Sequence, residues 1–236
     1  KTVGVKKFLY ASTQSVYGIS ENIDIEIKED TKNIMPITAY AKSKYKAENE
    51  ILKLSDKTFH TIIFRPATVF GPSINFRSDI VLNNLVASAH LYKKIIIQSD
   101  GTPWRPILHI DDMCNFFIKS LNKSEKLNKE IINLGYPKYN FQVKDLAEKV
   151  KKIIPDAEII IENKKIDNRT YKVNFDKVFK FFKDDIEFNL NIEQKIKELL
   201  DFYKKVNFDR DLFEGRKTIR MKQLKYLIDN KNVFKN

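Results

Sequence analysis

The sequence is poor in the residues that mark several common kinds of site. Its one cysteine, Cys114, excludes an internal disulfide and favours a reducing compartment, so we expect the cytoplasm. The three histidines, His60, His90 and His109, are scattered and form no metal-ligand spacing with the cysteine, so we predict no metal site. No stretch approaches the ~18 consecutive apolar residues of a membrane helix, and we expect no membrane partner.

Glycine is also scarce. The chain has 6 glycines, and none of them forms G-x-x-G-x-x-G or G-x-G-x-x-G. Such a Gly-rich turn places backbone amides against the pyrophosphate of a dinucleotide, so this element is absent from the 236 residues. The chain starts at Lys1 and not at Met, and Lys1 to Lys6 suggests the end of a helix that enters a strand.

Positive charge is in excess, with a formal net charge of +12. Such an excess is typical of nucleic-acid binding or of a solvated basic surface. The lysines are spread along the chain among Ile, Asn and acidic residues, with no stripe of interleaved aromatic and basic residues. We therefore expect no nucleic-acid partner, and a surface that attracts an anionic substrate such as a sugar diphosphate.

Short apolar runs alternate with amphipathic segments, which predicts an α/β fold with a parallel sheet. A hydrophobic fraction of 42% supports a globular core. The acidic and polar segment 19–36 is expected to form a loop over the site entrance. The expected strands are 8–11, 61–65, 95–98, 131–134 and 158–162, and the expected helices are 39–57, 80–91, 111–121, 143–154, 174–182 and 192–206.

The most informative pattern is Tyr40 followed four residues later by Lys44 within an expected helix. Residues at this spacing share a helix face. A lysine ammonium one turn away stabilises a phenolate, which lets a tyrosine exchange a proton with a substrate hydroxyl near neutral pH. Ser12 or Thr13, at the end of the preceding strand, can hold the same hydroxyl by a hydrogen bond. The alternatives are a buried structural tyrosine and an ordinary surface lysine.

Five segments together resemble one known family in their order along the chain. They are 8–18 with its Ser-Thr and Val-Tyr-Gly, the Tyr-x-x-x-Lys of 40–44, 64–72 with Arg-Pro-Ala-Thr-Val-Phe-Gly-Pro, 100–112, and 131–135. In this order they resemble the catalytic and C-terminal part of an extended short-chain dehydrogenase/reductase, in the NAD-dependent epimerase/dehydratase family that acts on nucleotide sugars. The resemblance covers most of the chain.

The resemblance implies a Rossmann-like parallel sheet that is truncated at its N-terminus, with a smaller C-terminal α+β substrate lobe. In this interpretation residues 1–72 are the C-terminal half of the Rossmann-like domain and carry the catalytic residues. Residues 73–206 form mostly the substrate-binding lobe, with segments that return to the main sheet. Residues 207–236 are a charged C-terminal tail.

The resemblance also implies roles for individual residues. Tyr40 is the catalytic acid and base, Lys44 holds the nicotinamide ribose, and Thr13 holds the reacting hydroxyl. The cofactor is NAD, with NADP left open because the residue that selects between them lies outside this sequence. The backbone contacts to the nicotinamide are expected from Pro66, Ala67 and Val69, in addition to Tyr40 and Lys44.

A nucleotide-diphosphate sugar is the implied substrate, and a homodimer the implied assembly. Arg105 is expected to grip the diphosphate, because a planar guanidinium suits that geometry. Thr68 takes the place of an Asn that often contacts the diphosphate in 4-epimerases. The other expected substrate contacts are Ser12, Thr13, Tyr17, Arg77 and Arg169. The pair His109 and Asp112 is interpreted as structural, tying a loop to the following helix.

The residues after the first strand favour one reaction over another. Family 4,6-dehydratases carry a motif similar to Thr-Asp-Glu, whereas this chain has Thr13-Gln14-Ser15 and offers no carboxyl group for elimination. The resemblance therefore favours a 4-epimerase, with a 4-keto reductase or a 4,6-dehydratase as alternatives. A non-catalytic module that binds a nucleotide sugar or a partner chain is the alternative of another class, and the missing Gly-rich turn supports it.

Overall fold

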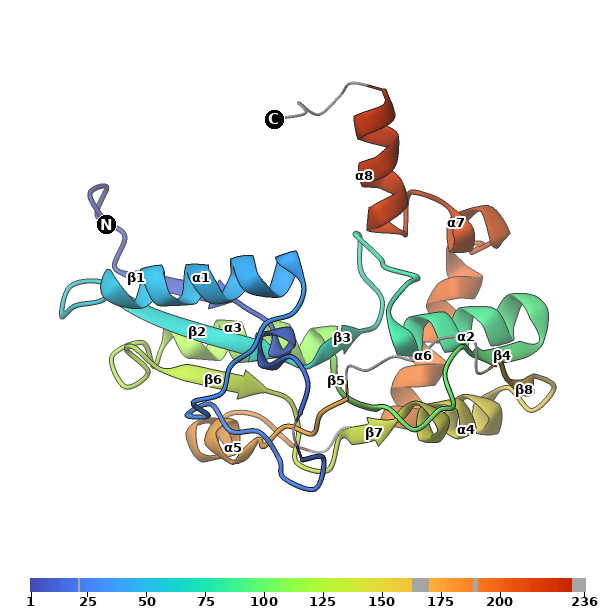
Figure 1. Cartoon of the computed structure of the whole chain (residues 1–236), viewed down its shortest axis with the longest axis horizontal. Coiled ribbons are helices and arrows are strands. Elements are labelled where there is room, and N and C mark those ends of the chain that lie inside the picture. The colour runs from blue at the N-terminus through green and yellow to red at the C-terminus, as the bar shows by residue number, and fades with distance from the viewer. Residues whose placement is uncertain (21, 163–169, 189–190, 231–236) are drawn as a thin grey trace. The chain divides into compact units, whose positions relative to one another are not determined.

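The computed structural model describes residues 1–20, 22–162, 170–188 and 191–230. The chain forms two compact units that interleave along the sequence (Figure 1). Unit 1 comprises Lys1–Val69, Pro103–Gln142 and Asp167–Leu190, and unit 2 comprises Phe70–Thr102, Val143–Ile166 and Asn191–Asn236. The functional division at residues 72 and 206 stays a prediction.

Unit 1 holds the main sheet and its covering helices. Strand β3, Thr68–Phe70, leads from unit 1 into unit 2. The other elements of unit 1 are β1 Lys7–Ala11, the 3-10 helix η1 Gln14–Tyr17, α1 Ala39–Lys53, β2 His60–Pro66, β5 Trp104–His109, α3 Ile110–Leu121, β6 Ile131–Leu134, β7 Asn140–Gln142 and α5 Asp176–Phe182.

The main sheet is parallel, in the order β1-β2-β6 (Figure 1). Ala11 of β1 pairs with Phe64 of β2, and Phe64 pairs with Ile132 of β6. The central strand β2 is buried along almost its whole length, with Ile62, Ile63 and Phe64 at its centre, as expected for a parallel strand that is covered on both faces. The predicted α/β fold with a parallel sheet is thus confirmed.

Alternate side chains of β2 face different layers, because successive Cβ atoms point to opposite sides of a strand. Ile62 and Phe64 belong to a buried cluster that also contains Phe116 of α3 and Phe182 of α5. Arg65 is turned the other way and contacts α1. Helix α1 therefore packs on the face of the sheet opposite to α3 and α5.

A second, short sheet has the order β3-β5-β7. Strands β5 and β7 are antiparallel, with Trp104 opposite Gln142 and Pro106 opposite Asn140. The sequence analysis did not foresee β5, because Pro106 disfavours a strand by removing a backbone donor. The end of β5 leads directly into α3 at Ile110.

Unit 2 is the smaller lobe, and its strand pair β4–β8 is parallel, with Ile95 opposite Ile159. Helices α2, α4 and α6 pack against one another. The Tyr203 hydroxyl of α6 donates to the Asn83 carbonyl of α2 at 2.8 Å. The elements are α2 Val81–Tyr92, β4 Lys94–Ile97, α4 Val143–Ile153, β8 Glu158–Ile161, α6 Ile192–Lys205, α7 Arg210–Glu214 and α8 Arg220–Asp229.

Two local predictions were wrong. Residues 1–6 form a turn and an irregular segment, with Gly4 at φ +82°, and not the end of a helix. Helix α1 ends at Lys53 and not at residue 57, because the Asp56 carboxylate accepts hydrogen bonds from the amides of Thr58 and Phe59 and forms a turn. In the described part of the chain, no helix combines the length and the apolarity needed to cross a bilayer.

Candidate active site

The carboxyl ends of β1 and β2 lie side by side, because Ala11 and Phe64 are partners in the parallel register. Backbone hydrogen bonds hold the chain where it leaves each strand. The Ser12 amide donates to the Phe64 carbonyl at 2.7 Å, and the Ala67 amide donates to the Leu134 carbonyl at 2.8 Å. Ligands of open parallel sheets bind at this end of the strands. The site residues predicted just after β1 and β2 therefore lie at one edge of the sheet.

Helix α1 begins beside this edge with a capped first turn. The Thr38 hydroxyl accepts a hydrogen bond from the Ala41 amide at 3.1 Å, which satisfies one of the free donors of the helix start. Tyr40 lies in this first turn and is 54% exposed. The phenol therefore reaches solvent, which excludes the alternative of a buried structural tyrosine.

Lys44 lies one turn further along α1 and is half-buried. Its ammonium donates to the Ala11 carbonyl at the end of β1, at 2.8 Å. It lies 5.9 Å from the ring centroid of Tyr40 and 4.8 Å from that of Tyr10. The contact fixes the ammonium between the sheet edge and the Tyr40 ring. An ammonium has three donors, so two N–H groups remain for a ligand.

Thr13 follows the end of β1 and caps η1. Its hydroxyl oxygen accepts a hydrogen bond from the Ser15 amide at 3.1 Å. Within the described parts of the chain, no residue accepts the Thr13 hydroxyl proton. That proton can be donated to a ligand oxygen, as the predicted role requires. The side chain is half-buried.

A buried ion pair lies beneath these residues. Arg65 of β2 donates to both carboxylate oxygens of Glu48 on α1, at 3.0 and 2.6 Å, and each side chain is only 1% exposed. Burial is the largest single effect and works against the charged guanidinium, but the hydrogen bonds and charge interactions with Glu48 and Tyr17 together outweigh it and raise the pKa of Arg65. The pair joins α1 to the central strand of the sheet.

Ser12 and Tyr17, both predicted to contact substrate, are joined to this pair. The Ser12 hydroxyl donates to Glu48, and Arg65 donates to the Tyr17 hydroxyl at 3.1 Å. The Tyr17 hydroxyl in turn donates to the Asn133 side chain at 2.6 Å. Burial raises the pKa of Tyr17 to about 12, although Arg65 opposes the shift. Both side chains already have protein partners, and their contacts with substrate stay predictions.

Gln14 is buried at the same edge and is 1% exposed. Its amide nitrogen donates to the Arg65 carbonyl at 3.2 Å and to the Leu134 carbonyl at 3.4 Å. The side chain thus links the ends of β2 and β6. The structure gives Gln14 a role in holding the strand ends, which its sequence position alone did not reveal.

The four residues from the end of β2 to the middle of β3 differ in exposure. Pro66 and Ala67 are buried, whereas Thr68 and Val69 are partly exposed. The Ala67 amide already donates within the sheet, so any contact from Ala67 to a cofactor would use other atoms. The predicted cofactor contacts of Pro66, Ala67 and Val69, and the substrate contact of Thr68, stay predictions.

The structure describes two of the three arginines that were predicted to bind substrate, and each of these two has a partner within its own unit. Arg105 is on β5 in unit 1, is half-buried, and donates to the Trp104 carbonyl at 2.8 Å. Arg77 belongs to unit 2, where its guanidinium contacts both oxygens of Asp79 at 2.9 and 2.8 Å. Arg169 lies outside the described residues. The roles of all three stay predictions.

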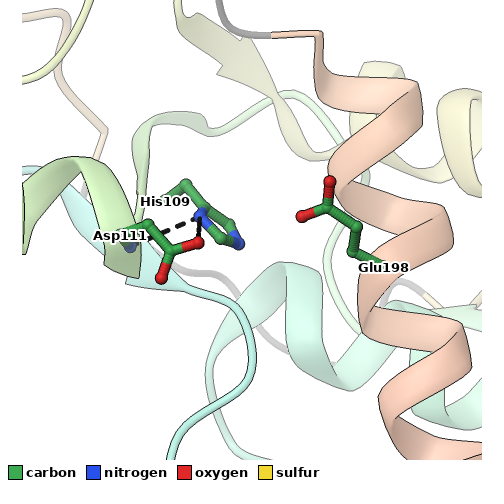
Figure 2. Close-up of side chains that lie close together, drawn as sticks. All are labelled: His109, Asp111 and Glu198. Carbon is green, nitrogen blue, oxygen red and sulfur yellow. Dashed lines mark hydrogen bonds and ion pairs between the residues drawn. The ribbon is translucent and has the colours of Figure 1, made fainter. Parts of the chain in front are cut away.

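His109 ends β5, is 1% exposed, and caps α3 (Figure 2). Its Nδ1 accepts a hydrogen bond from the Asp111 amide at 3.4 Å and lies 3.5 Å from the Asp111 carboxylate. Asp112, the expected partner, instead accepts a hydrogen bond from Tyr136, where burial and the carboxylate raise the pKa of the phenol. The structural interpretation of His109 fits this cap, but the partner is Asp111.

The sequence analysis missed Glu48 and Arg65, although one signal was available. Glu48 follows Lys44 by four residues, as Lys44 follows Tyr40, so all three lie on one face of α1. A charged residue on the face that packs against the sheet requires a buried partner. That partner is Arg65, and it could not be identified before the packing of α1 on β2 was known.

A known protein family matches the part of the chain that contains these site residues. The family model described as the NAD dependent epimerase/dehydratase family matches residues 1–135, from before β1 to just after β6. The matched region contains Thr13, Tyr40 and Lys44. The chain belongs to the NAD-dependent epimerase/dehydratase family.

Relatives within the family carry different activities. The chain is 34% identical over 161 residues to a UDP-glucuronate 4-epimerase of Thermodesulfobacterium geofontis, an alignment that covers 65% of this chain and 46% of the relative. It is 30% identical over 155 residues to a dTDP-D-glucose 4,6-dehydratase of Mus musculus, covering 65% of this chain and 41% of the relative. The chain therefore spans about half the length of these curated relatives.

Solved structures show the family fold at lower identity. The UDP-glucuronic acid 4-epimerase of Bacillus cereus, in complex with UDP-glucuronic acid and NAD, has a TM-score of 0.71 and 21% identity, and the match covers 85% of this chain and 62% of that chain. TunA, an NAD-dependent NDP-hexosamine 5,6-dehydratase, also has a TM-score of 0.71, with 23% identity, covering 86% and 64%.

The residues of this family member fit one end of an NAD molecule. The exposed Tyr40 phenol and the anchored Lys44 ammonium stand at the carboxyl edge of the sheet, where a nicotinamide riboside would bind. The pyrophosphate end is not matched in the same way, because the 236 residues contain no Gly-rich turn.

Proposed function

We propose that this protein is an NAD-dependent nucleotide-sugar epimerase that acts as a 4-epimerase through transient oxidation of a sugar hydroxyl. The observation that carries the proposal is the anchoring of Lys44 to the Ala11 carbonyl, which fixes the ammonium near the exposed Tyr40 phenol. Thr13, two residues beyond Ala11, has a hydroxyl proton to donate. An acid/base group, a fixed cation and a hydroxyl donor thus come from α1 and the end of β1.

Each residue has a separate task in this proposal. Tyr40 accepts the proton of the sugar hydroxyl and later returns it. Lys44 holds the cofactor ribose with its remaining donors. Thr13 donates to the reacting oxygen and fixes its position. The nicotinamide, when bound, supplies the oxidant for the sugar carbon and is restored at the end of the cycle.

The substrate class rests on charge and on the relatives. A nucleotide sugar carries a diphosphate, and the net charge of +12 attracts such an anion. The relatives named above act on UDP- and dTDP-linked sugars. Arg105 is proposed to bind the diphosphate. NADP is the alternative cofactor, and a homodimer is proposed as the active assembly.

We propose epimerisation and not dehydration because Gln14 stands where a dehydratase of this family carries an acidic residue. An elimination requires an acid and a base beside the sugar ring, and the positions after Thr13 hold an amide and a hydroxyl. Gln14 is also buried, with its amide bonded to the Arg65 and Leu134 carbonyls. Some dehydratases are among the relatives, so a 4,6-dehydratase is the second candidate, and a 4-keto reductase is a third.

The experiment is product analysis with the natural polypeptide that contains these residues. The protein is incubated with NAD and UDP-, ADP- or dTDP-linked hexoses and hexuronates, and products are separated by chromatography and identified by mass and NMR. We expect an isomer of unchanged mass. A 4-keto-6-deoxy product, lighter by one water, would show dehydration, and the interpretation of Gln14 would be wrong.

A non-catalytic module would give a different pattern. It would bind nucleotide sugar with saturation but form no product at any NAD concentration, and it would not exchange the sugar C4 hydrogen. Detection of the isomer excludes this alternative. Its absence, with intact nucleotide-sugar binding, would favour the module over the enzyme.

A further inference from the structure

A hollow of about 610 Å³ opens at the amino ends of β1 and β2. Its lining comes from the start of both strands and from the segments just after α1 and α3. Five lysines and one glutamate, Glu125, are among the lining residues, together with hydroxyl and imidazole donors. The hollow is therefore strongly cationic, and its whole lining belongs to unit 1.

Three of the five lysines are not neutralised. In the described residues, no carboxylate pairs with Lys6, Lys57 or Lys126. Lys123 pairs with Asp185, and the Lys7 ammonium donates to a carbonyl at 2.7 Å and keeps its charge. Unneutralised ammonium groups around one hollow repel one another, and a bound anion removes that repulsion.

The lining limits the chemistry of the anion. Among the described residues, no Phe, Tyr or Trp lines the hollow, and its one aromatic ring is the small imidazole of His60, so a nucleobase gains little stacking there. Nor does any arginine offer a planar fork for a carboxylate or phosphate. Lysine instead binds phosphate as a mobile point charge. These features suit a compact group with several phosphates, and they disfavour recognition of a base or of single-stranded nucleic acid.

The hollow is separate from the candidate active site. It contains Lys7 and His60, the first residues of β1 and β2, whereas Ser12 and Thr13 follow the opposite end of β1. A rise of ~3.3 Å per residue puts the two ends of a five-residue strand roughly 13 Å apart. A ligand in the hollow cannot be the reacting sugar.

We propose that this lysine-lined hollow is a binding site for a compact polyphosphate group, either as inorganic polyphosphate or as the phosphate tail of a nucleotide. The recognised unit is the row of phosphates, held by Lys6, Lys57 and Lys126. His60 and Ser124 add polar groups at the wall of the hollow, where the His60 Nδ1 lies 3.3 Å from the Ser124 hydroxyl. The proposal does not depend on the activity proposed above.

The test is calorimetric binding of tripolyphosphate to the full chain at low ionic strength. The double variant Lys57→Glu/Lys126→Glu reverses two charges of the lining. Its matched control, Lys46→Glu/Lys180→Glu, makes the same change in net charge on exposed faces of α1 and α5. We expect the lining variant to lose affinity on the order of tenfold or more, while the control changes it by about twofold or less.

Further arms identify the source of the phosphates. ATP should bind about as tightly as tripolyphosphate, because the base gains little stacking from the single imidazole of the lining, and both affinities should fall with added salt. Equal losses in the lining variant and the control would overturn the proposal, because binding would then follow net charge alone. ATP or single-stranded RNA that binds more tightly and tolerates the lining substitutions would overturn it as well. Circular dichroism confirms that each variant is folded.

Discussion

Tyr40 and Glu48 lie on the same face of α1 but in opposite environments. Tyr40 is 54% exposed, whereas Glu48 is 1% exposed and paired with Arg65. Lys44 lies between them and bonds to the end of β1. This face of the helix thus changes from exposed to buried against the sheet within two turns.

Removal of Glu48 tests the weight of that ion pair. The change Glu48→Ala leaves the buried Arg65 guanidinium without its counter-charge, and breaking a buried pair in this way typically costs about 3–5 kcal/mol. We expect the free energy of unfolding, measured by urea titration, to fall by about that amount. A fall below about 1 kcal/mol would show that water or another group satisfies Arg65.

Glu50→Ala is the matched control on the same helix. Glu50 is exposed and pairs with Lys53 at 2.8 Å. Such surface pairs contribute little, so the change should leave the free energy of unfolding almost unchanged. A large effect at both positions would point to α1 as a whole and not to the buried pair.

The sequence revealed only part of this site, for a physical reason. Tyr40 and Lys44 are four residues apart, so local helix geometry alone predicts their common face. Glu48 and Arg65 are separated by 17 positions, and Tyr17 and Asn133 by 116. Those pairs depend on which helix packs on which strand, and residue spacing does not encode that.

At the scale of elements, the cap of α1 controls the turn that carries Tyr40. The Thr38 hydroxyl accepts from the Ala41 amide at 3.1 Å. We expect Thr38→Ala to lower stability by about 1 kcal/mol, and Thr38→Ser to retain most of it, since serine caps as well. Thermal or urea unfolding measures both. Equal losses in the two variants would show that the methyl group and not the cap matters.

Gly18 ends η1 in a conformation that few other residues adopt. Its φ is +74°, and a Cβ at this position would lie 2.1 Å from the Met35 carbonyl oxygen. Gly4 has a similar φ of +82°, but its Cβ would meet no atom within 4 Å. A side chain at position 4 would therefore add backbone strain alone, whereas a side chain at position 18 would add similar strain and a steric clash with Met35.

We expect Gly4→Ala to cost about 1 kcal/mol or less, from strain alone. Gly18→Ala should cost distinctly more, because the segment around Met35 must move. The measurement is urea unfolding of both variants. Equal losses of unfolding free energy in the two variants would mean that the segment around Met35 moves away from the new methyl group without a measurable cost.

Prediction at the element scale succeeded where the pattern was strong. Short, mainly apolar runs at 61–65 and 131–134 identified β2 and β6, because a parallel strand that is covered on both faces is rich in apolar residues. It failed at β5, where Pro106 sits in a strand, and at residues 1–6. At β5 the pairing with β7 decided the conformation against local preference, whereas residues 1–6 form a local turn in which the Gly4 amide donates to the Lys1 carbonyl.

At the scale of the whole chain, the parallel sheet could be predicted, and the resemblance implied that later segments return to it, but the positions where the chain crosses between the two units could not be predicted. Residues 103–142 return to unit 1 after a passage through unit 2, and no local signal marks Val69 or Thr102 as crossing points. Long-range contacts choose these crossings.

The scarcity of glycine leads to a prediction at the same scale. A dinucleotide pyrophosphate normally rests on amides at a Gly-rich helix start, and these 236 residues contain no such turn. We expect calorimetry on this chain to give an NAD dissociation constant far above micromolar. Micromolar affinity would show that other residues bind the pyrophosphate.

The central claim is that Tyr40 exchanges the proton of the sugar hydroxyl. The direct measurement compares Tyr40→Phe with Tyr45→Phe, a change of the same kind on the same helix, in the natural polypeptide with its nucleotide sugar and NAD. We predict that Tyr40→Phe lowers kcat by about 10²–10⁴-fold, since only proton transfer is lost, and leaves the dissociation constant of the nucleotide sugar nearly unchanged. Tyr45→Phe should retain near-normal turnover. A Tyr40→Phe protein with normal kcat would contradict the account.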